Sequence, residues 1–483
     1  MSSLKKNIAY QSFYEILILI LPFFTSPYIA RVMGADYIGL FSYTYSIAYY
    51  FHLFGMLGIK FYGNRSIAKV RDSHSDTVRV YNEIFALHEI VSILSAIVYF
   101  VFCVFGAKYR TYAFLQGFLV LSSVFDVSWL FFGLERFKQT VTWSTVIKVV
   151  SVVLIFCLVK SKNDFPVYIL IMTGGQFLNS IILFALSFKV IEYKMPRITE
   201  LKKHIKPLLI LFIPILALSL FKYMDKIMLG GLGEKKELGY YENAEKLINI
   251  PLSVVFAFGS VMLPRITNVV AQDNKASAEK YLRLTVKFLV GLSFAMAFGL
   301  AAVSTVFAPV FWGKGFVKSG ELIALLAITI PFSTLASIIR NQDMIPNGHD
   351  MYYSVSIVLG AIVNLVVNYL LIPRYQSLGV TIGTIVAEIV VCCSELWFVR
   401  KSNAYFKYLL STILFVPAGL IMYILVTLLG KIIGIHIYTP IIQVAVGVLV
   451  FGLLIVPTFW VSKDEDYKSV FSVLKRDKTS SYE

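Results

Sequence analysis

The stretch that decides the fold class is Thr439-Pro-Ile-Ile-Gln-Val-Ala-Val-Gly-Val-Leu-Val-Phe-Gly-Leu-Leu-Ile-Val-Pro-Thr-Phe-Trp-Val461. It holds 23 residues, and none of them is Asp, Glu, Lys or Arg. A helix needs about 20 mostly apolar residues to cross about 30 Å of hydrocarbon. The apolar residues do not alternate with polar ones, as they would in the strands of a membrane barrel. The stretch therefore predicts a membrane-spanning helix.

The same length criterion is met along the whole chain. It predicts an all-α polytopic membrane protein with about 14 transmembrane helices. Their centres lie near Leu17, Tyr49, Ile97, Phe118, Val153, Ile171, Leu218, Val254, Ser293, Leu325, Val363, Ile385, Val416 and Val450.

The composition of the 483 residues agrees with this class. Hydrophobic residues make up 58% and charged residues 15%, whereas soluble domains average about 45–50% and about 25%. A soluble enzyme, a disordered chain and a fibrous protein are thereby excluded. The four cysteines all lie in apolar runs without disulfide or metal-ligand spacing, so they predict small buried side chains and no metal site.

The basic residues indicate how the chain is oriented. With the N-terminus placed in the cytoplasm, 28 of the 44 Lys and Arg residues fall on inner segments, 11 on outer segments and 5 within spans. Because cytoplasmic loops are enriched in Lys and Arg, this count predicts that both termini are cytoplasmic. The net charge of +16 is therefore mostly an orientation signal, and no nucleic-acid partner is expected.

An internal similarity predicts two lobes of six helices around a central cavity, followed by two C-terminal helices. Ile29–Gly34 with Gly39–Tyr43 resembles Met228–Gly233 with Gly239–Tyr241, at an offset of about 200 residues. The predicted divisions are residues 1–194, residues 195–400, and residues 401–483 with the two additional helices and a cytoplasmic tail.

Charges inside the spans are the informative residues, because each costs at least about 2.5 kcal/mol at the bilayer centre. The acids among them are Glu15, Asp126, Asp225, Glu242, Glu245, Glu388 and Glu395, and the bases are Lys148, Lys222, Lys226, Lys246 and Lys287. At a rise of 1.5 Å per residue, several of these residues on different spans lie at the same calculated depth in the membrane. The predicted partners are Asp126 with Lys148, Lys226 with Glu242, Lys222 with Glu245, and Lys222 with Asp225 on one helix.

Structural ion pairing alone explains this set poorly. Buried pairs seldom stabilise a fold more than the apolar packing that they displace. A hydrated central cavity with partly cationic walls explains the whole set better.

Several motifs resemble the Wzx-type polysaccharide flippases. The N-terminal signature is Pro27-Tyr-Ile-Ala-Arg-Val-Met-Gly-Ala-Asp-Tyr-Ile-Gly39, followed by Gly58-Ile-Lys-Phe-Tyr-Gly-Asn-Arg65. Later stretches are similar to the same family, in the family's order. They are Gly133–Lys138, Asp225–Gly230 with Gly239–Tyr241, and Asn364–Pro373 with Gly379–Gly383.

This resemblance implies the multidrug/oligosaccharidyl-lipid/polysaccharide exporter (MOP) superfamily, which works by alternating access. It implies a multi-pass protein of a bacterial cytoplasmic membrane that moves an undecaprenyl-pyrophosphate-linked oligosaccharide to the outer leaflet for capsule, exopolysaccharide or O-antigen synthesis. Membrane lipids, a polysaccharide polymerase and other assembly proteins are the expected partners.

The residues allow a chemical interpretation of such a substrate. Related lipid II flippases carry an arginine cluster in early helices and the eighth, whereas the first, second and eighth spans here have no interior arginine. A cationic site would therefore use lysine, which binds phosphate as a point charge. The candidates are Lys148, Lys222, Lys226 and Lys246 for pyrophosphate, and Tyr45, Tyr49 and Tyr50 for stacking on sugars.

Two other functions stay open. In a cation-coupled drug antiporter of the same fold, cavity acids would bind protons, sodium or cationic drugs; such acids could also couple export to a gradient, without any cofactor. For the antiporter these are above all Glu15, Asp225 and Glu245. The possible charge partners or coupling-ion sites are Glu15, Asp126, Asp225, Glu242 and Glu245. A polysaccharide polymerase or glycosyltransferase would need a large loop outside the membrane, which the sequence lacks, so no enzyme and no catalytic residue is predicted.

Overall fold

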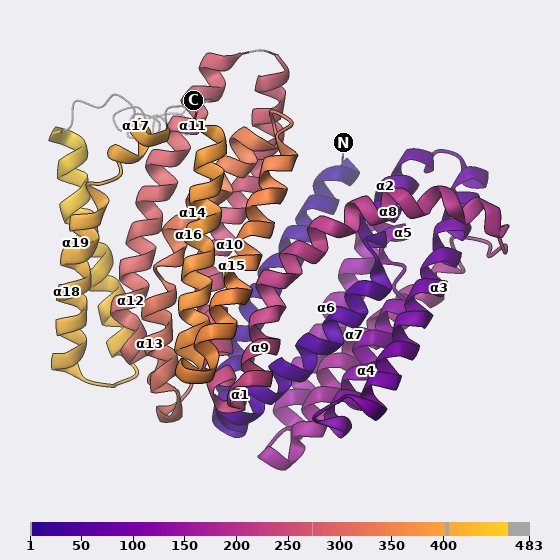
Figure 1. Ribbon diagram of the computed structural model, residues 1–483, viewed down its shortest axis with the longest axis horizontal. Coiled ribbons are helices and arrows are strands. Elements are labelled where there is room, and N and C mark those ends of the chain that lie inside the picture. Colours follow the sequence, from indigo (N-terminus) through magenta and orange to yellow (C-terminus); the bar gives the residue numbers. More distant parts are fainter. Residues whose placement is uncertain (1, 273, 401–404, 462–483) are drawn as a thin grey trace. The chain divides into compact units, whose positions relative to one another are not determined.

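The computed structural model describes residues 2–272, 274–400 and 405–461. The secondary-structure elements in these ranges are helices, and no strand occurs among them. The chain divides into two compact units, which are unit 1 (Met1–Glu242) and unit 2 (Asn243–Glu483). Figure 1 shows the helices of both units in sequence colours.

The first helix is long enough for two spans. Helix α1 (Ser2–Met56) has 55 residues, or about 80 Å at 1.5 Å per residue, which is more than twice the hydrocarbon thickness. It breaks at Gly34, where φ is 75° and ψ is 175°. A positive φ is readily adopted only by glycine, so the glycine at this position permits the break.

Unit 1 is a bundle around α1. Helix α1 packs against α3, α4 and α6, and α4 packs against α7. Its elements are α1, α2 (Ile59–Val70), α3 (His74–Phe105), α4 (Arg110–Val124), α5 (Ser128–Gly133), α6 (Phe137–Leu158), η1 (Lys162–Asp164), α7 (Phe165–Ser187), α8 (Ile198–Ser219), η2 (Leu220–Met224), α9 (Asp225–Leu232) and the first turns of α10 (Lys235–Ala271).

Polar contacts hold the start of α8 on this bundle. The carboxylate of Glu83, whose side chain is 2% exposed, accepts hydrogen bonds from Lys203 at 2.7 Å and from His204 at 2.9 Å. The other ring nitrogen of His204 lies 2.7 Å from the Tyr62 hydroxyl. Helix α8 is therefore tied to both α2 and α3.

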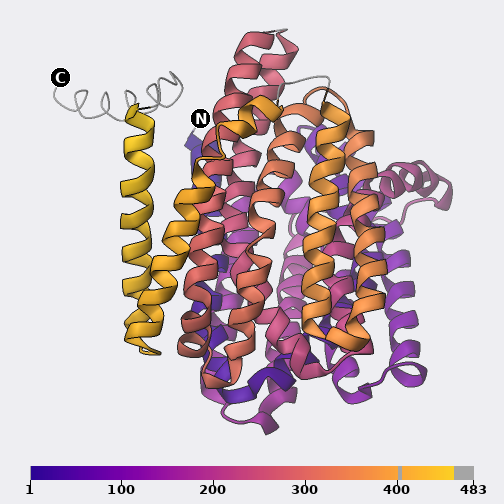
Figure 2. The same cartoon turned by 60° about the vertical axis from the view of Figure 1, so that its left-hand side comes forward.

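Unit 2 contains the rest of α10 and the later helices. Helices α15 and α16 pack side by side, and α12 packs against α13 and α18. In both views α18 and α19 stand together at one edge of this unit (Figure 1, Figure 2). Its further elements are α11 (Lys275–Thr285), η3 (Val286–Val290), α12 (Gly291–Phe311), η4 (Lys314–Phe316), α13 (Val317–Leu326), α14 (Thr329–Ile339), η5 (Arg340–Met344), α15 (Asp350–Tyr375), α16 (Ser377–Val399), α17 (Tyr405–Leu410), α18 (Phe415–Ile433) and α19 (Thr439–Val461).

These helices confirm the predicted fold class. By length and composition, 11 helices of the described residues could cross a membrane, or 12 if Lys314–Leu326 and Thr329–Met344, bent by 45°, form one span. These 12 carry the third to fourteenth predicted centres, and α1 carries the first two. The protein is an all-α, multi-pass membrane protein.

Candidate functional site

A row of aromatic rings runs along α1 in unit 1. Phe41, Tyr45 and Tyr49 are four residues apart, a spacing that places side chains on one face of a helix. Their neighbouring rings are stacked, with centroids 5.5 Å apart for Phe41 and Tyr45 and 6.3 Å for Tyr45 and Tyr49. Tyr49 also stacks on Tyr223 at 3.9 Å, the shortest of these three separations. The row therefore continues from α1 onto a second segment of unit 1.

That second segment is a π-helical turn, η2. Such turns are rare and occur frequently at functional sites. Tyr223 lies in this turn, and the ammonium groups of Lys222 and Lys226 lie 5.7 Å and 5.8 Å from the centre of its ring. Two of the four lysines predicted for the site thus meet at one tyrosine, which sequence reasoning had not selected.

Lys226 has an anionic partner. Its ammonium lies 2.8 Å from Glu242, and the two side chains are only 9% and 12% exposed. Ser42 donates a further hydrogen bond of 2.7 Å to the same carboxylate. The predicted Lys226–Glu242 pair is therefore confirmed, and the charge of Lys226 is balanced inside the protein.

Lys222 differs from Lys226. Its side chain is exposed, and it forms no ion pair with any residue of unit 1 that the structure describes. The predicted pair of Lys222 with Asp225 is therefore not formed, whereas the pair of Lys222 with Glu245, a residue of unit 2, stays a prediction. Asp225 is buried and accepts a hydrogen bond of 3.0 Å from the Tyr241 hydroxyl. The prediction assumed the spacing of a regular α-helix, and the π turn at Leu220–Met224 breaks that spacing.

The predicted pair of Asp126 and Lys148 is also not formed. Lys148 is half-buried on α6 and has no ion pair within the described ranges. Asp126 lies between α4 and α5, where its carboxylate accepts a 2.9 Å hydrogen bond from the backbone N–H of Ser128. The span breaks at this point, so the depth calculated for one continuous helix did not apply.

The remaining candidates fall elsewhere. Lys246 is exposed and Glu245 half-buried on the part of α10 that belongs to unit 2. Tyr50 donates a hydrogen bond of 3.3 Å to the backbone oxygen of Ser219 and makes no ring contact in the row. The side chain of Glu15 lies outside the described part of the chain.

Two acids within spans of unit 2, Glu388 and Glu395, have partners inside that unit. Glu395, whose side chain is fully buried, pairs with Arg340 at 3.2 Å. Glu388 accepts a hydrogen bond of 2.7 Å from Ser333. Within the described ranges, no three His, Cys, Asp or Glu side chains form a group that could hold a metal ion.

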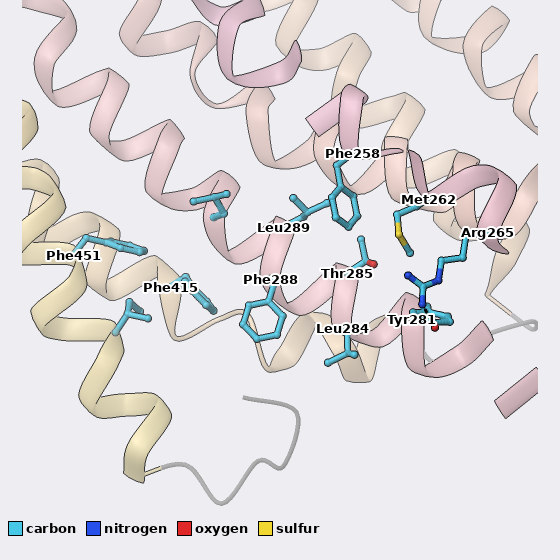
Figure 3. Close-up of a pocket in the computed structure, with 12 residues that line it drawn as sticks. Phe258, Met262, Arg265, Tyr281, Leu284, Thr285, Phe288, Leu289, Phe415 and Phe451 are labelled. Carbon is cyan, nitrogen blue, oxygen red and sulfur yellow. Dashed lines mark hydrogen bonds between the residues drawn. The ribbon is translucent and has the colours of Figure 1, made fainter. Parts of the chain in front are cut away.

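Unit 2 also contains an apolar pocket of about 560 Å³ between α10, α11, α12, α18 and α19. Figure 3 shows phenylalanines of these helices around it, with Arg265 and Tyr281 together at one side. The guanidinium of Arg265 lies over the Tyr281 ring at 4.7 Å and donates a 2.7 Å hydrogen bond to its hydroxyl. This volume is within the range of ligand pockets, and its lining suits a hydrocarbon chain.

Known proteins resemble this chain over most of its length. A family model described as "Polysaccharide biosynthesis protein" matches residues 4–270. A "Putative O-antigen transporter" of Shigella dysenteriae is 25% identical over 402 residues, which cover 80% of this chain and 98% of that protein. A protein of Escherichia coli (strain K12) with the same description is 22% identical, over 83% of this chain and 98% of its own.

A solved structure shares the fold. "Lipid II flippase MurJ, inward closed conformation" superposes with a TM-score of 0.72, covers 92% of this chain and 98% of its own, and is 17% identical. The similarity at this identity concerns the fold alone. Together with the family match, it confirms the motif-based resemblance described above.

Proposed function

Since the chain belongs to the polysaccharide biosynthesis protein family, we propose that it is a flippase for a lipid-linked oligosaccharide. In more detail, we propose that the substrate is an oligosaccharide linked to undecaprenyl pyrophosphate. The protein would move it from the cytoplasmic to the outer leaflet by alternating access. The relatives described as O-antigen transporters and the fold shared with a lipid II flippase support it. The protein acts in this proposal as a transporter and not as an enzyme.

The observation that carries the proposal is the combination of Lys222 with the tyrosine row. A charged headgroup cannot enter hydrocarbon without a very large desolvation cost. Lys222 is an exposed cation with no ion pair among the described residues, so it can meet a phosphate oxygen. Tyr45, Tyr49 and Tyr223 offer rings for sugars beside it.

The lipid tail has its own candidate site. The apolar pocket of unit 2 is large enough for part of a hydrocarbon chain, and Arg265 at its side suits an anionic group near the chain. The orientation proposed is the one favoured by the basic residues, with both termini in the bacterial cytoplasm. Coupling to a sodium or proton gradient through Asp225 or Glu242 is part of the proposal, to be tested in vesicles with each gradient collapsed in turn.

The experiment compares Lys222→Ala with Lys160→Ala, which removes an exposed lysine from the α6–α7 loop. The purified protein is reconstituted in liposomes, and a lipid-linked oligosaccharide is added to one leaflet. Its appearance in the other leaflet is then measured. We expect Lys222→Ala to lower the transport rate at least about tenfold, because one charge-assisted phosphate contact contributes roughly 1.5–3 kcal/mol. Lys160→Ala should transport like the wild type.

Two results would contradict this proposal. Transport at the wild-type rate in Lys222→Ala would remove Lys222 from the substrate path. Absence of lipid transport, together with export of cationic drugs by the wild type, would favour the antiporter instead. The same assay on Lys148→Ala tests another candidate lysine of unit 1; we expect this change to reduce transport while insertion into the membrane is unchanged.

A further inference from the structure

A second lysine–tyrosine cluster lies at a different place in unit 1, around Tyr109. Tyr109 precedes α4, and its ring packs edge-on against Tyr43 of α1 with centroids 6.1 Å apart. The ammonium of Lys235, the first residue of α10, lies 4.6 Å from the centre of the Tyr109 ring, and that of Lys108 lies 5.8 Å from the same centre. Two cations from segments far apart in the sequence therefore share one aromatic ring.

The position of Lys235 is fixed by its backbone. A Cβ atom on Gly39 would lie 1.8 Å from the carbonyl oxygen of Lys235, and one on Gly239 would lie 1.9 Å from that of Ala35. These distances leave no room for any side chain at either glycine. The first turn of α10 is thus in direct contact with α1 just after its break, which holds Lys235 beside Tyr109.

Neither lysine has a counterion in the part of the chain that the structure describes. Glu234 and Glu237 flank Lys235 in the sequence, yet no carboxylate lies within 4.0 Å of Lys235 or of Lys108. Since both ammonium nitrogens lie near one ring centre, they are at most about 10 Å apart and repel each other. Such a pair is stabilised by an anion placed between the two charges.

The surrounding backbone favours an anion as well. Helix α4 begins directly after Tyr109, and the N-terminal end of a helix carries partial positive charge; the start of α10, by contrast, has Glu237 in its first turn. Helix α4 has no acidic residue in its first turn and no side-chain cap. Two further basic residues, Lys236 directly after Lys235 and Arg110 directly after Tyr109, are exposed.

The location contradicts the usual distribution of charge. Under the orientation favoured by the basic residues, Lys108 and Lys235 lie on outer segments, where Lys and Arg are depleted in membrane proteins. Helix α9, which leads into α10, lies toward the end of unit 1 away from the N mark in Figure 1. A concentration of unpaired lysines at this end needs a reason other than orientation.

We propose that Lys108 and Lys235, joined at Tyr109, bind the phosphate oxygens of an anionic lipid headgroup at the outer end of unit 1. This deepens the proposed function and rests on it for the identity of the lipid: the headgroup is the pyrophosphate of the carrier lipid after translocation. An anionic phospholipid of the outer leaflet presents the same phosphate chemistry. Such a site would retain the headgroup once it has left the tyrosine row at Tyr223.

The test measures lipid binding by the full chain. Native mass spectrometry counts lipids bound to the detergent-purified protein, titrated separately with a polyprenyl pyrophosphate and with phosphatidylglycerol. The variant is Lys108→Gln with Lys235→Gln, and the matched control is Lys160→Gln with Lys162→Gln, which removes the same charge from another outer loop of unit 1. We expect affinity to fall about tenfold or more in the variant and to stay unchanged in the control.

The outcomes separate the two sources of phosphate and the two proposals. Weaker binding of both lipids, or of the pyrophosphate alone, supports the site for the carrier lipid; weaker binding of phosphatidylglycerol alone supports the site but assigns it to bulk phospholipid. Equal binding of both lipids by variant and wild type overturns the inference, whatever the transport assay shows.

If the double variant does not fold, the single Lys108→Gln change, at an exposed side chain, is measured instead. If the wild type binds these lipids in a lysine-dependent way but does not transport a lipid-linked oligosaccharide, the proposed function is overturned and the lipid-binding site at Tyr109 stands.

Discussion

Two lysine–tyrosine clusters of unit 1 use the same residue types and differ in one respect. At Tyr223, one of the two lysines is neutralised: the buried Lys226 has a carboxylate 2.8 Å away, whereas the exposed Lys222 has none in the described ranges. At Tyr109, Lys108 and Lys235 face one ring with no carboxylate within 4.0 Å in the described ranges. The difference separates a lysine that holds the fold together from lysines that are available to a ligand.

The contrast also explains why counting intramembrane lysines is a poor guide to a binding site. A buried lysine must be neutralised by the protein itself, because an unpaired buried charge costs several kcal/mol. The lysines that can receive an anion are the exposed ones, such as Lys222 and Lys108. Four predictions test this contrast between the two clusters.

The largest effect is expected for Glu242→Gln. This change removes the carboxylate that lies 2.8 Å from the buried ammonium of Lys226 and should lower the free energy of unfolding by about 3–5 kcal/mol. Denaturant unfolding in detergent micelles measures the loss. Adding Lys226→Met should restore most of the stability, since the uncompensated charge is then gone. A loss below about 1 kcal/mol is typical of solvent-exposed ion pairs. It would show that Lys226 and Glu242 do not hold the fold together, and the two clusters would then not differ in this respect.

A smaller effect is expected for Tyr49→Leu, which removes the ring that stacks on Tyr223 at 3.9 Å. An aromatic pair contributes about 0.5–1.5 kcal/mol beyond the area it buries, and the free energy of unfolding should fall by that amount. Tyr49→Phe keeps the ring and is the control for stability. Equal stability of the Leu and Phe variants would show that the stack does not order η2.

Tyr109→Leu should cost less, about 0.5–1 kcal/mol, because its contacts with Lys108 and Lys235 are cation–π contacts of a half-buried ring. Tyr109→Phe retains the face of the ring and should be as stable as the wild type. Thermal unfolding of the three proteins in the same detergent provides the comparison. A stability loss in the Phe variant as large as in the Leu variant would instead assign the role to the hydroxyl group.

The smallest effect is expected for Lys108→Gln with Lys235→Gln. This variant loses the same cation–π contacts as Tyr109→Leu, but it also removes the repulsion between the two ammonium groups, and neither lysine has an ion pair in the described structure. The free energy of unfolding should therefore change by no more than about 0.5 kcal/mol. Unfolding in 0.1 M and 1 M NaCl extends the test, since salt shortens the Debye length from about 10 Å to about 3 Å. A loss of several kcal/mol in this variant would mean that the lysines are structural, as at Lys226.

The sequence was sufficient for the class of fold, because a run such as Thr439–Val461 has no alternative to a membrane helix. Depth along a helix also predicted the Lys226–Glu242 pair. Depth fails where a helix is irregular. The break after Val124 moves Asp126 away from the predicted geometry, and the π turn at Leu220–Met224 does the same for Lys222.

The cluster at Tyr109 was beyond sequence reasoning for another reason. Lys108 and Lys235 are 127 positions apart, and only the packing of the α3–α4 loop against the start of α10 brings them together. The repeated glycines did carry a signal. Gly39 and Gly239, which the internal similarity aligned, belong to the two segments that contact each other directly.

That glycine contact has a mechanical consequence. Helix α10 passes from unit 1 into unit 2, and its first turn is clamped to α1 because no side chain fits between the backbones at Gly39 and Gly239. The start of α10 is therefore fixed in position on unit 1. Pro251, which removes a backbone hydrogen bond inside the helix, is the first proline after this fixed turn, so the regular hydrogen bonding of α10 is first interrupted in its unit 2 part.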